Sequence, residues 1–172
     1  MTADEVKKAL GLRPHPVEGG WYVRTYEATE TIVAEAFSDL RYLRKGRAGR
    51  LTGTAIYYLL EPGTFSEMHR LKSDEVFHFY MGDAVEMLQL RTGGHGERVV
   101  IGTDLAAGER PQVVVERGVW QGSRLAGGGS WALLGCSVSP GFEFEDYEEG
   151  SRAELVAEWP EWKEMIVGLT RR

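Results

Sequence analysis

The sequence contains a single cysteine, Cys136, among its 172 residues. One cysteine excludes an internal disulfide and any metal cluster that is held by cysteines alone. Because Cys136 lies in the apolar run of residues 131–136, we interpret it as a buried structural thiol rather than as a nucleophile.

Long apolar runs are also absent. No stretch of 18 apolar residues, the length that a membrane-spanning helix needs, occurs anywhere in the chain. The first residues, MTADEVKKAL, mix acidic residues with lysines and contain no apolar core of the kind found in a secretory signal. We therefore expect a reduced, cytoplasmic protein with no membrane partner.

Positive charge is scarce as well. The chain has 20 lysines and arginines against 26 aspartates and glutamates, a net charge of −6. Such a chain has no general attraction for nucleic-acid phosphates or anionic lipids. The basic block of residues 41–50 (RYLRKGRAGR) has no nucleic-acid-binding motif around it, and we interpret it as a solvated loop. We expect no nucleic-acid partner.

Glycine, in contrast, is abundant: the 22 glycines are about twice the usual share. Short β-type runs alternate with turn signals from Trp21 to Glu145, and this spacing leaves no room for crossover helices. The glycine clusters at 93–96 and 127–129 precede neither a helix nor a GK[ST] sequence, which excludes a phosphate-binding loop. Helical spacing occurs only at 3–10 and about 151–169. The pattern predicts one all-β domain over residues 1–172, with a barrel or sandwich at about 20–147.

The segment GTFSEMHRLKSDEVFHFYMG, Gly63 to Gly82, carries the most chemical information. We interpret it as two strands joined by a turn at Lys72 and Ser73. Side chains alternate along a strand, so one face receives three residues from each strand. The first strand contributes Glu67, His69 and Leu71, and the second contributes Glu75, Phe77 and Phe79. His69 and Glu75 are therefore expected to converge inside the barrel.

The spacing of this segment resembles the first motif of the cupin superfamily, G-x5-H-x-H-x3,4-E-x6-G, through Gly63, His69, Glu75 and Gly82. The later segment GERPQVVVERGVWQGSRL resembles the second motif, G-x5-P-x-G-x2-H-x3-N, in its spacing. Three side chains of that motif differ: they are Glu116, Gln121 and Leu125 in place of proline, histidine and asparagine.

From about Leu12 to Leu169 the chain resembles a group of compact bacterial and fungal cupins, the "cupin five" family, whose biochemical role is mostly unassigned. The resemblance implies a jelly-roll barrel, the double-stranded β-helix, with a short N-terminal helix and a C-terminal helical segment. It also implies a homodimer with a small-molecule pocket in the barrel mouth. Large apolar side chains on both parities of the 77–90 region independently favour a homodimer.

The matching positions are poor in metal ligands. A typical metallocupin has three imidazoles and one carboxylate, whereas Leu71 and Gln121 here replace two of the histidines. An amide is a weak ligand for transition metals and a leucine is none, so we expect no cofactor and no metal. The alternative is a rebuilt metal site of His69, Glu75 and Gln121, or one in which a β-bulge brings His78 round to join His69 and Glu75. His78 lies three residues beyond Glu75, so alternation points it to the opposite strand face, where we expect a hydrogen-bonded residue.

These residues predict a small-molecule-binding cupin with His69 and Glu75 as catalytic candidates. His69 would be a base oriented by Glu75, in a metal-independent isomerase, epimerase or lyase acting on a sugar-like or nucleotide-linked metabolite. One alternative is a non-catalytic module in which Gln121 and Ser123 bind the ligand and Phe77 and Phe79 form walls. The other is a metal-dependent dioxygenase or lyase.

The remaining aromatic and histidine residues are assigned by position alone. Candidate pocket or rim aromatics are Tyr57, Tyr80, Trp21 and Trp120. His15 and His95 fall in turn-like segments, and we expect both to be exposed loop residues. The acidic residues of 143–149 are expected to form a solvated face.

Overall fold

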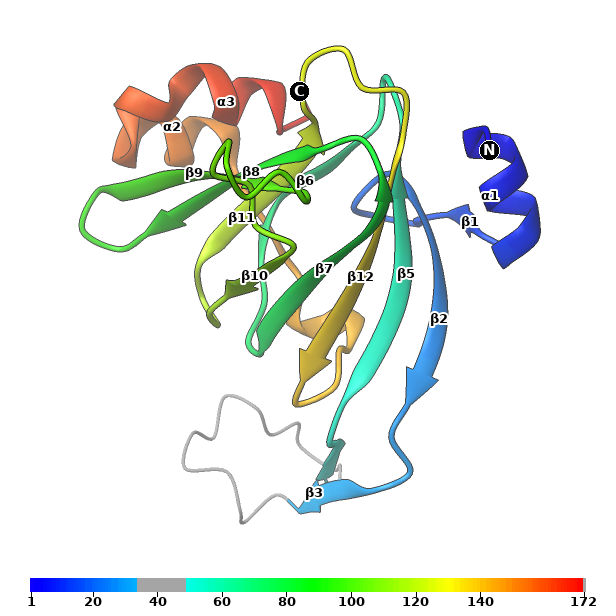
Figure 1. Ribbon diagram of the computed structural model, residues 1–172. Coiled ribbons are helices and arrows are strands. Elements are labelled where there is room, and N and C mark those ends of the chain that lie inside the picture. Colours follow the sequence, from blue (N-terminus) through cyan, green and yellow to red (C-terminus); the bar gives the residue numbers. More distant parts are fainter. Residues whose placement is uncertain (34–48, 172) are drawn as a thin grey trace.

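The computed structural model describes residues 1–33 and 49–171 (Figure 1). Most of the basic block, residues 41–48, lies outside the described residues. Strands dominate the described parts, and helices occur near the two ends of the chain. The predicted all-β class, with helical segments at both ends, is confirmed. No helix among the described residues is long and apolar enough to cross a membrane.

Two antiparallel sheets form the body of the protein. The six-stranded sheet has the order β1-β2-β5-β12-β7-β10. Its strands are β1 (Arg13–Pro14), β2 (Trp21–Glu27), β5 (Thr54–Leu60), β7 (Asp74–Gly82), β10 (Gln112–Val115) and β12 (Ala132–Ser139). The five-stranded sheet has the order β13-β6-β11-β8-β9. Its strands are β6 (Phe65–Arg70), β8 (Val85–Arg91), β9 (His95–Ile101), β11 (Trp120–Leu125) and β13 (Glu148–Glu149). A small separate pair joins β3 (Thr31–Val33) to β4 (Gly49–Leu51).

The sheets face one another, and the space between them is filled by alternate side chains of both. Tyr58, Phe77 and Leu134 come from the six-stranded sheet and Met87 from the five-stranded sheet, and all are buried in one cluster. Burial of these apolar side chains drives the layers together, because each one contributes roughly 1.5–3 kcal/mol.

The helices cover the outer faces. Helix α1 (Ala3–Leu10) starts with a capping box of Thr2 and Glu5 and packs on the six-stranded sheet through Val6. At the other end, α2 (Arg152–Glu158), the 3-10 turn η4 (Pro160–Trp162) and α3 (Lys163–Gly168) cover the five-stranded sheet (Figure 1). Trp159 is 2% exposed and its indole N–H donates to the Arg91 carbonyl at 3.1 Å, which fixes α2 to β8.

The two strands of the His69 segment correct one expectation. We expected them to share one hairpin face, but β6 belongs to the five-stranded sheet and β7 to the six-stranded sheet. The chain crosses between the sheets at residues 71–73. His69 and Glu75 nevertheless converge, because they project inward from opposite walls of the barrel.

The segment after β12 also differs from the expectation of a strand followed by a solvated acidic face. Residues 144–146 form the 3-10 turn η3 (Phe144–Asp146). Asp146 is only 9% exposed and forms an ion pair with the buried Arg50. A buried cation needs a buried partner, and this pair places the aromatic residues of 142–144 over one end of the barrel.

Candidate active site

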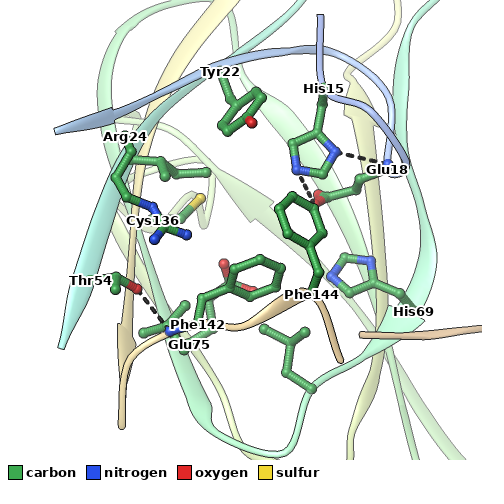
Figure 2. A pocket seen from close by; sticks show the side chains of 13 residues that line it. His15, Glu18, Tyr22, Arg24, Thr54, His69, Glu75, Cys136, Phe142 and Phe144 are labelled. Carbon is green, nitrogen blue, oxygen red and sulfur yellow. Dashed lines mark hydrogen bonds and ion pairs between the residues drawn. The ribbon is translucent and has the colours of Figure 1, made fainter. Parts of the chain in front are cut away.

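A pocket opens at the end of the barrel where Phe142 and Phe144 lie. It encloses about 450 Å³, including space open to solvent (Figure 2). Its polar lining comes from the loop after β1 and from strands of both sheets. The lining residues are His15, Glu18, Tyr22, Arg24, Thr54, Ile56, His69, Leu71, Glu75, Cys136, Val138, Phe142 and Phe144.

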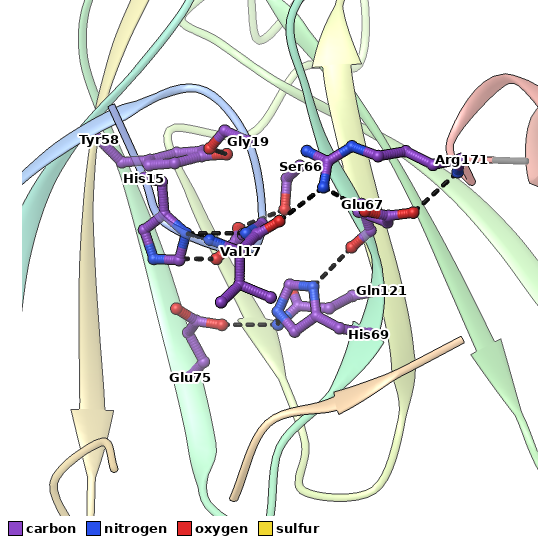
Figure 3. Close-up of polar contacts among 11 residues, drawn as sticks. His15, Val17, Gly19, Tyr58, Ser66, Glu67, His69, Glu75, Gln121 and Arg171 are labelled. Atoms are coloured by element: carbon purple, nitrogen blue, oxygen red, sulfur yellow. Dashed lines mark hydrogen bonds and ion pairs between the residues drawn. The ribbon is translucent and has the colours of Figure 1, made fainter. Parts of the chain in front are cut away.

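Gln121 lies between His69 and Glu75 and links them (Figure 3). Its amide nitrogen is 2.5 Å from Glu75 Oε2 and 3.4 Å from His69 Nε2. All three side chains are at most 7% exposed, and Gln121 is the direct cross-strand neighbour of His69. An amide NH₂ has two hydrogens to donate, so one group serves both partners. The amide oxygen Oε1 is buried and has no partner.

These contacts assign the tautomer of His69. Its Nδ1 lies 2.6 Å from the carbonyl oxygen of Glu67, which accepts and cannot donate, so Nδ1 carries the hydrogen. Nε2 is then the acceptor that meets the Gln121 amide. The ring stacks on Tyr147 at a centroid distance of 4.7 Å, which fixes its plane. His69 therefore presents a basic nitrogen at the pocket floor.

Burial, and after it the negative charge of Glu18, raise the pKa of Glu75 to about 8, although hydrogen bonds from Gln121 and Cys136 act in the opposite direction. At neutral pH Glu75 is therefore mostly a neutral carboxylic acid. The predicted role of Glu75 as the group that orients His69 is not what the geometry supports. Glu67 orients the imidazole, and Gln121 separates it from Glu75.

The structure corrects the expectation for His15. It is not an exposed loop residue: its side chain is 4% exposed and lines the pocket. Nδ1 accepts the Glu18 backbone N–H at 2.8 Å, and the ring meets Tyr22 edge-on at 4.6 Å. Burial lowers the pKa of His15.

Gly19 explains why the loop that carries His15 reaches the barrel. Its φ is +102°, and a Cβ there would lie 2.3 Å from the Phe65 carbonyl oxygen. Only glycine permits both this backbone conformation and this close approach. In the sequence, the paired glycines of PHPVEGG are the feature that could have predicted this close approach of the loop.

Comparison with known proteins agrees with this architecture. Residues 4–149 match the family described as Cupin_5, Cupin superfamily (DUF985). The chain belongs to the cupin superfamily.

Solved structures extend the match. A Shewanella oneidensis protein is 36% identical, with a TM-score of 0.84 over 99% of this chain and 98% of that one. A hypothetical protein from Leishmania major is 29% identical, with a TM-score of 0.84 over the whole of both chains. A Bacillus subtilis oxalate decarboxylase variant shares 13% identity and a TM-score of 0.52 over 94% of this chain and 38% of that one, a likeness of fold alone. No curated protein matches.

The other predicted site residues of this cupin lie around the pocket rather than in it. Ser123 is fully buried with an unpartnered hydroxyl, and it does not line the pocket. Phe77 and Phe79 belong to the core cluster. Tyr57 was expected at the pocket or its rim, but it lies on the outer face of the six-stranded sheet. The centroid of its ring is 5.8 Å from that of Tyr80.

The remaining candidates also lie outside the pocket. His78 lies on the outer strand face as expected, with hydrogen-bond partners Ser137 and Gln112. His95 is exposed, although it lies on β9 rather than in a loop. Trp21 donates to Glu61, and Trp120 stacks under Arg70.

The donor set at the floor does not fit the metal of a typical metallocupin. Among the described residues, no three His, Cys, Asp or Glu side chains are placed to hold a metal ion. Glu75 Oε2 accepts from the Gln121 amide at 2.5 Å, so this amide would have to turn away before that oxygen could ligate a metal. Leu71 lines the same pocket and has no donor. Metal content itself stays a prediction.

Proposed function

We propose that this cupin binds a small carbonyl-containing metabolite and moves a proton on it by metal-independent acid–base chemistry, as an isomerase or epimerase. The observation that carries the proposal is the amide bridge, which holds a basic imidazole and a protonated carboxyl in one buried pocket. A base and an acid with different environments are what proton transfer at neutral pH requires.

The chemistry follows from the two groups. His69 Nε2 accepts the proton of a carbon next to the carbonyl, and Glu75 donates a hydrogen bond to the carbonyl oxygen as it gains negative charge. The 3.4 Å contact from Gln121 is longer than an ordinary hydrogen bond, so Nε2 is weakly occupied before substrate binds. The imidazolium then returns the proton to carbon.

Exchange of substrate hydrogen for deuterium tests the proposal. Incubation in D₂O with ketoses, aldoses and 2-oxo acids is expected to add one deuterium to a substrate, detected by mass spectrometry. His69→Gln is expected to slow this exchange by about 10²- to 10⁴-fold. The control is His78→Gln, which alters a histidine on the outer strand face and is expected to leave the rate unchanged.

Two outcomes would contradict the proposal. Ligand retention without exchange in any substrate class would favour the non-catalytic binding module. One tightly bound metal equivalent in protein purified without metal affinity, lost in both His69→Ala and Glu75→Ala, would favour the metal-dependent dioxygenase or lyase.

We also propose that this cupin is a homodimer joined through the outer face of the six-stranded sheet. Beyond α1 this face exposes Tyr80, Met81 and Val114, each 45–51% accessible. Sedimentation is expected to give twice the chain mass of 19.2 kDa. Met81→Lys is expected to shift it towards the monomer, whereas Val167→Lys, on the exposed side of α3, is not. A wild-type monomer at micromolar concentration would contradict this assignment.

A further inference from the structure

Arg24 is an arginine on the inner face of a barrel strand, where apolar residues are the rule. It alternates with Tyr22 on β2 and pairs with Ile56 of β5, and it lines the pocket. Figure 2 shows its guanidinium directed into the pocket beside Cys136, on the side away from Glu18. Its side chain is 29% exposed, so the guanidinium is only partly solvated and an anionic partner stabilises it.

The partner within the protein satisfies Arg24 only in part. Nη1 forms an ion pair with Glu27, whose side chain is 55% exposed to solvent. Nε and Nη2 have no hydrogen-bond partner among the described residues. A guanidinium carries five N–H donors in a planar fork that matches a carboxylate or a phosphate. Several donors of Arg24 are therefore available to a ligand.

His15 and Glu75 add hydrogen-bond donors to the pocket. His15 accepts at Nδ1, so in its neutral form Nε2 carries the hydrogen. Burial keeps Glu75 mostly protonated at neutral pH, so it adds no negative charge at the floor. Among the described lining residues, Glu18 is the one carboxylate that opposes an anion, and it lies across the pocket, where the Ser66 hydroxyl donates to it. The charge distribution favours a ligand whose anionic end faces Arg24.

We propose that the substrate is a small anionic carbonyl compound whose carboxylate or phosphate pairs with Arg24 while its carbonyl reaches the His69–Gln121–Glu75 floor. This inference rests on the proposed function and narrows its substrate class. Arg24 is then the residue that selects charged over neutral ligands. Glu27 holds the guanidinium from the solvent side, which leaves the opposite edge of the fork for the ligand.

Matched ligand pairs test the proposal. Calorimetry would compare pyruvate with its neutral amide, and dihydroxyacetone phosphate with dihydroxyacetone, so that each pair differs mainly in charge. The anion is expected to bind more tightly in at least one pair, and the pair that responds distinguishes carboxylate from phosphate. Arg24→Ala is expected to weaken the anion by about 10- to 100-fold and leave the neutral partner unchanged.

Two further variants complete the design. Arg24→Lys keeps the charge but loses the fork, and it is expected to weaken the anion less than Arg24→Ala does. Arg98→Ala is the control, because Arg98 pairs with Glu86 on the other sheet. It is expected to bind both members of each pair as the wild type does.

The failures of the two proposals are distinguishable. Equal binding of charged and neutral partners, with no effect of Arg24→Ala, would overturn the anionic substrate class even if deuterium exchange is observed. Binding of the anion through Arg24 without any deuterium exchange would support the anionic ligand class and overturn the acid–base function.

Discussion

Glu75→Gln is expected to stabilise the fold at neutral pH while it removes the proposed activity. The pKa of Glu75 is about 8 in the folded protein, against an ordinary value of 4.5. At pH 7 the unfolded chain therefore ionises this group and the folded protein does not, which favours unfolding by on the order of 3 kcal/mol. Glutamine is neutral in both states and has almost the same shape, so this penalty disappears.

The sign of the pH dependence follows directly. The folded protein binds one more proton than the unfolded chain between pH 4.5 and about 8, so stability from this group is present below pH 4.5 and is lost as pH rises to about 8. Chemical denaturation at pH 5, 7 and 9 measures it.

The wild type is expected to lose more stability than Glu75→Gln across this range. Glu116→Gln, at an exposed position, is the matched control and should follow the wild type. Parallel curves for wild type and Glu75→Gln would show that Glu75 is ionised in the folded protein, and the acid in the mechanism would then have to be another group.

Arg171→Ala is expected to cost about 1–3 kcal/mol of stability, because it leaves the carboxylate of Glu67, whose side chain is 3% exposed, without its half-exposed cation. Glu67 Oε1 accepts the Arg171 backbone N–H at 2.7 Å, and its Oε2 lies 2.9 Å from Arg171 Nη1. The same Nη1 donates to the Val17 carbonyl at 2.7 Å (Figure 3). One side chain thus joins the end of the chain to the loop that carries His15 and to the strand that carries His69.

Thermal or chemical denaturation measures this loss, and two further variants identify its cause. Arg98→Ala removes a half-exposed ion pair and is expected to cost less than about 1 kcal/mol. Adding Glu67→Gln to Arg171→Ala removes the stranded charge as well, so the double variant should recover part of the loss. A loss in Arg171→Ala no larger than that in Arg98→Ala would show that water solvates the Glu67 carboxylate.

The fold could be predicted from the sequence by itself, because turn spacing and helical periodicity are local patterns. Closely spaced turns exclude crossover helices, and helical periodicity near each end predicts the helices that cover the two sheets. The motif spacing also identified His69, Glu75 and Gln121 as neighbours, although β6 and β7 belong to different sheets. Alternation alone placed His78 on the outer face, because the side-chain period of a strand is two residues.

Only the tertiary structure decided the contacts and the protonation of these residues. Whether an acid is ionised depends on its burial and on charges that come from other segments. The charge of Glu18, for example, raises the pKa of Glu75. The entry of His15 into the pocket depends on a close approach at Gly19, and the inward direction of Arg24 depends on which face of β2 meets the core. Side-chain spacing reports which residues share a face, but protonation and ligand access arise from the groups that the folded chain brings opposite them.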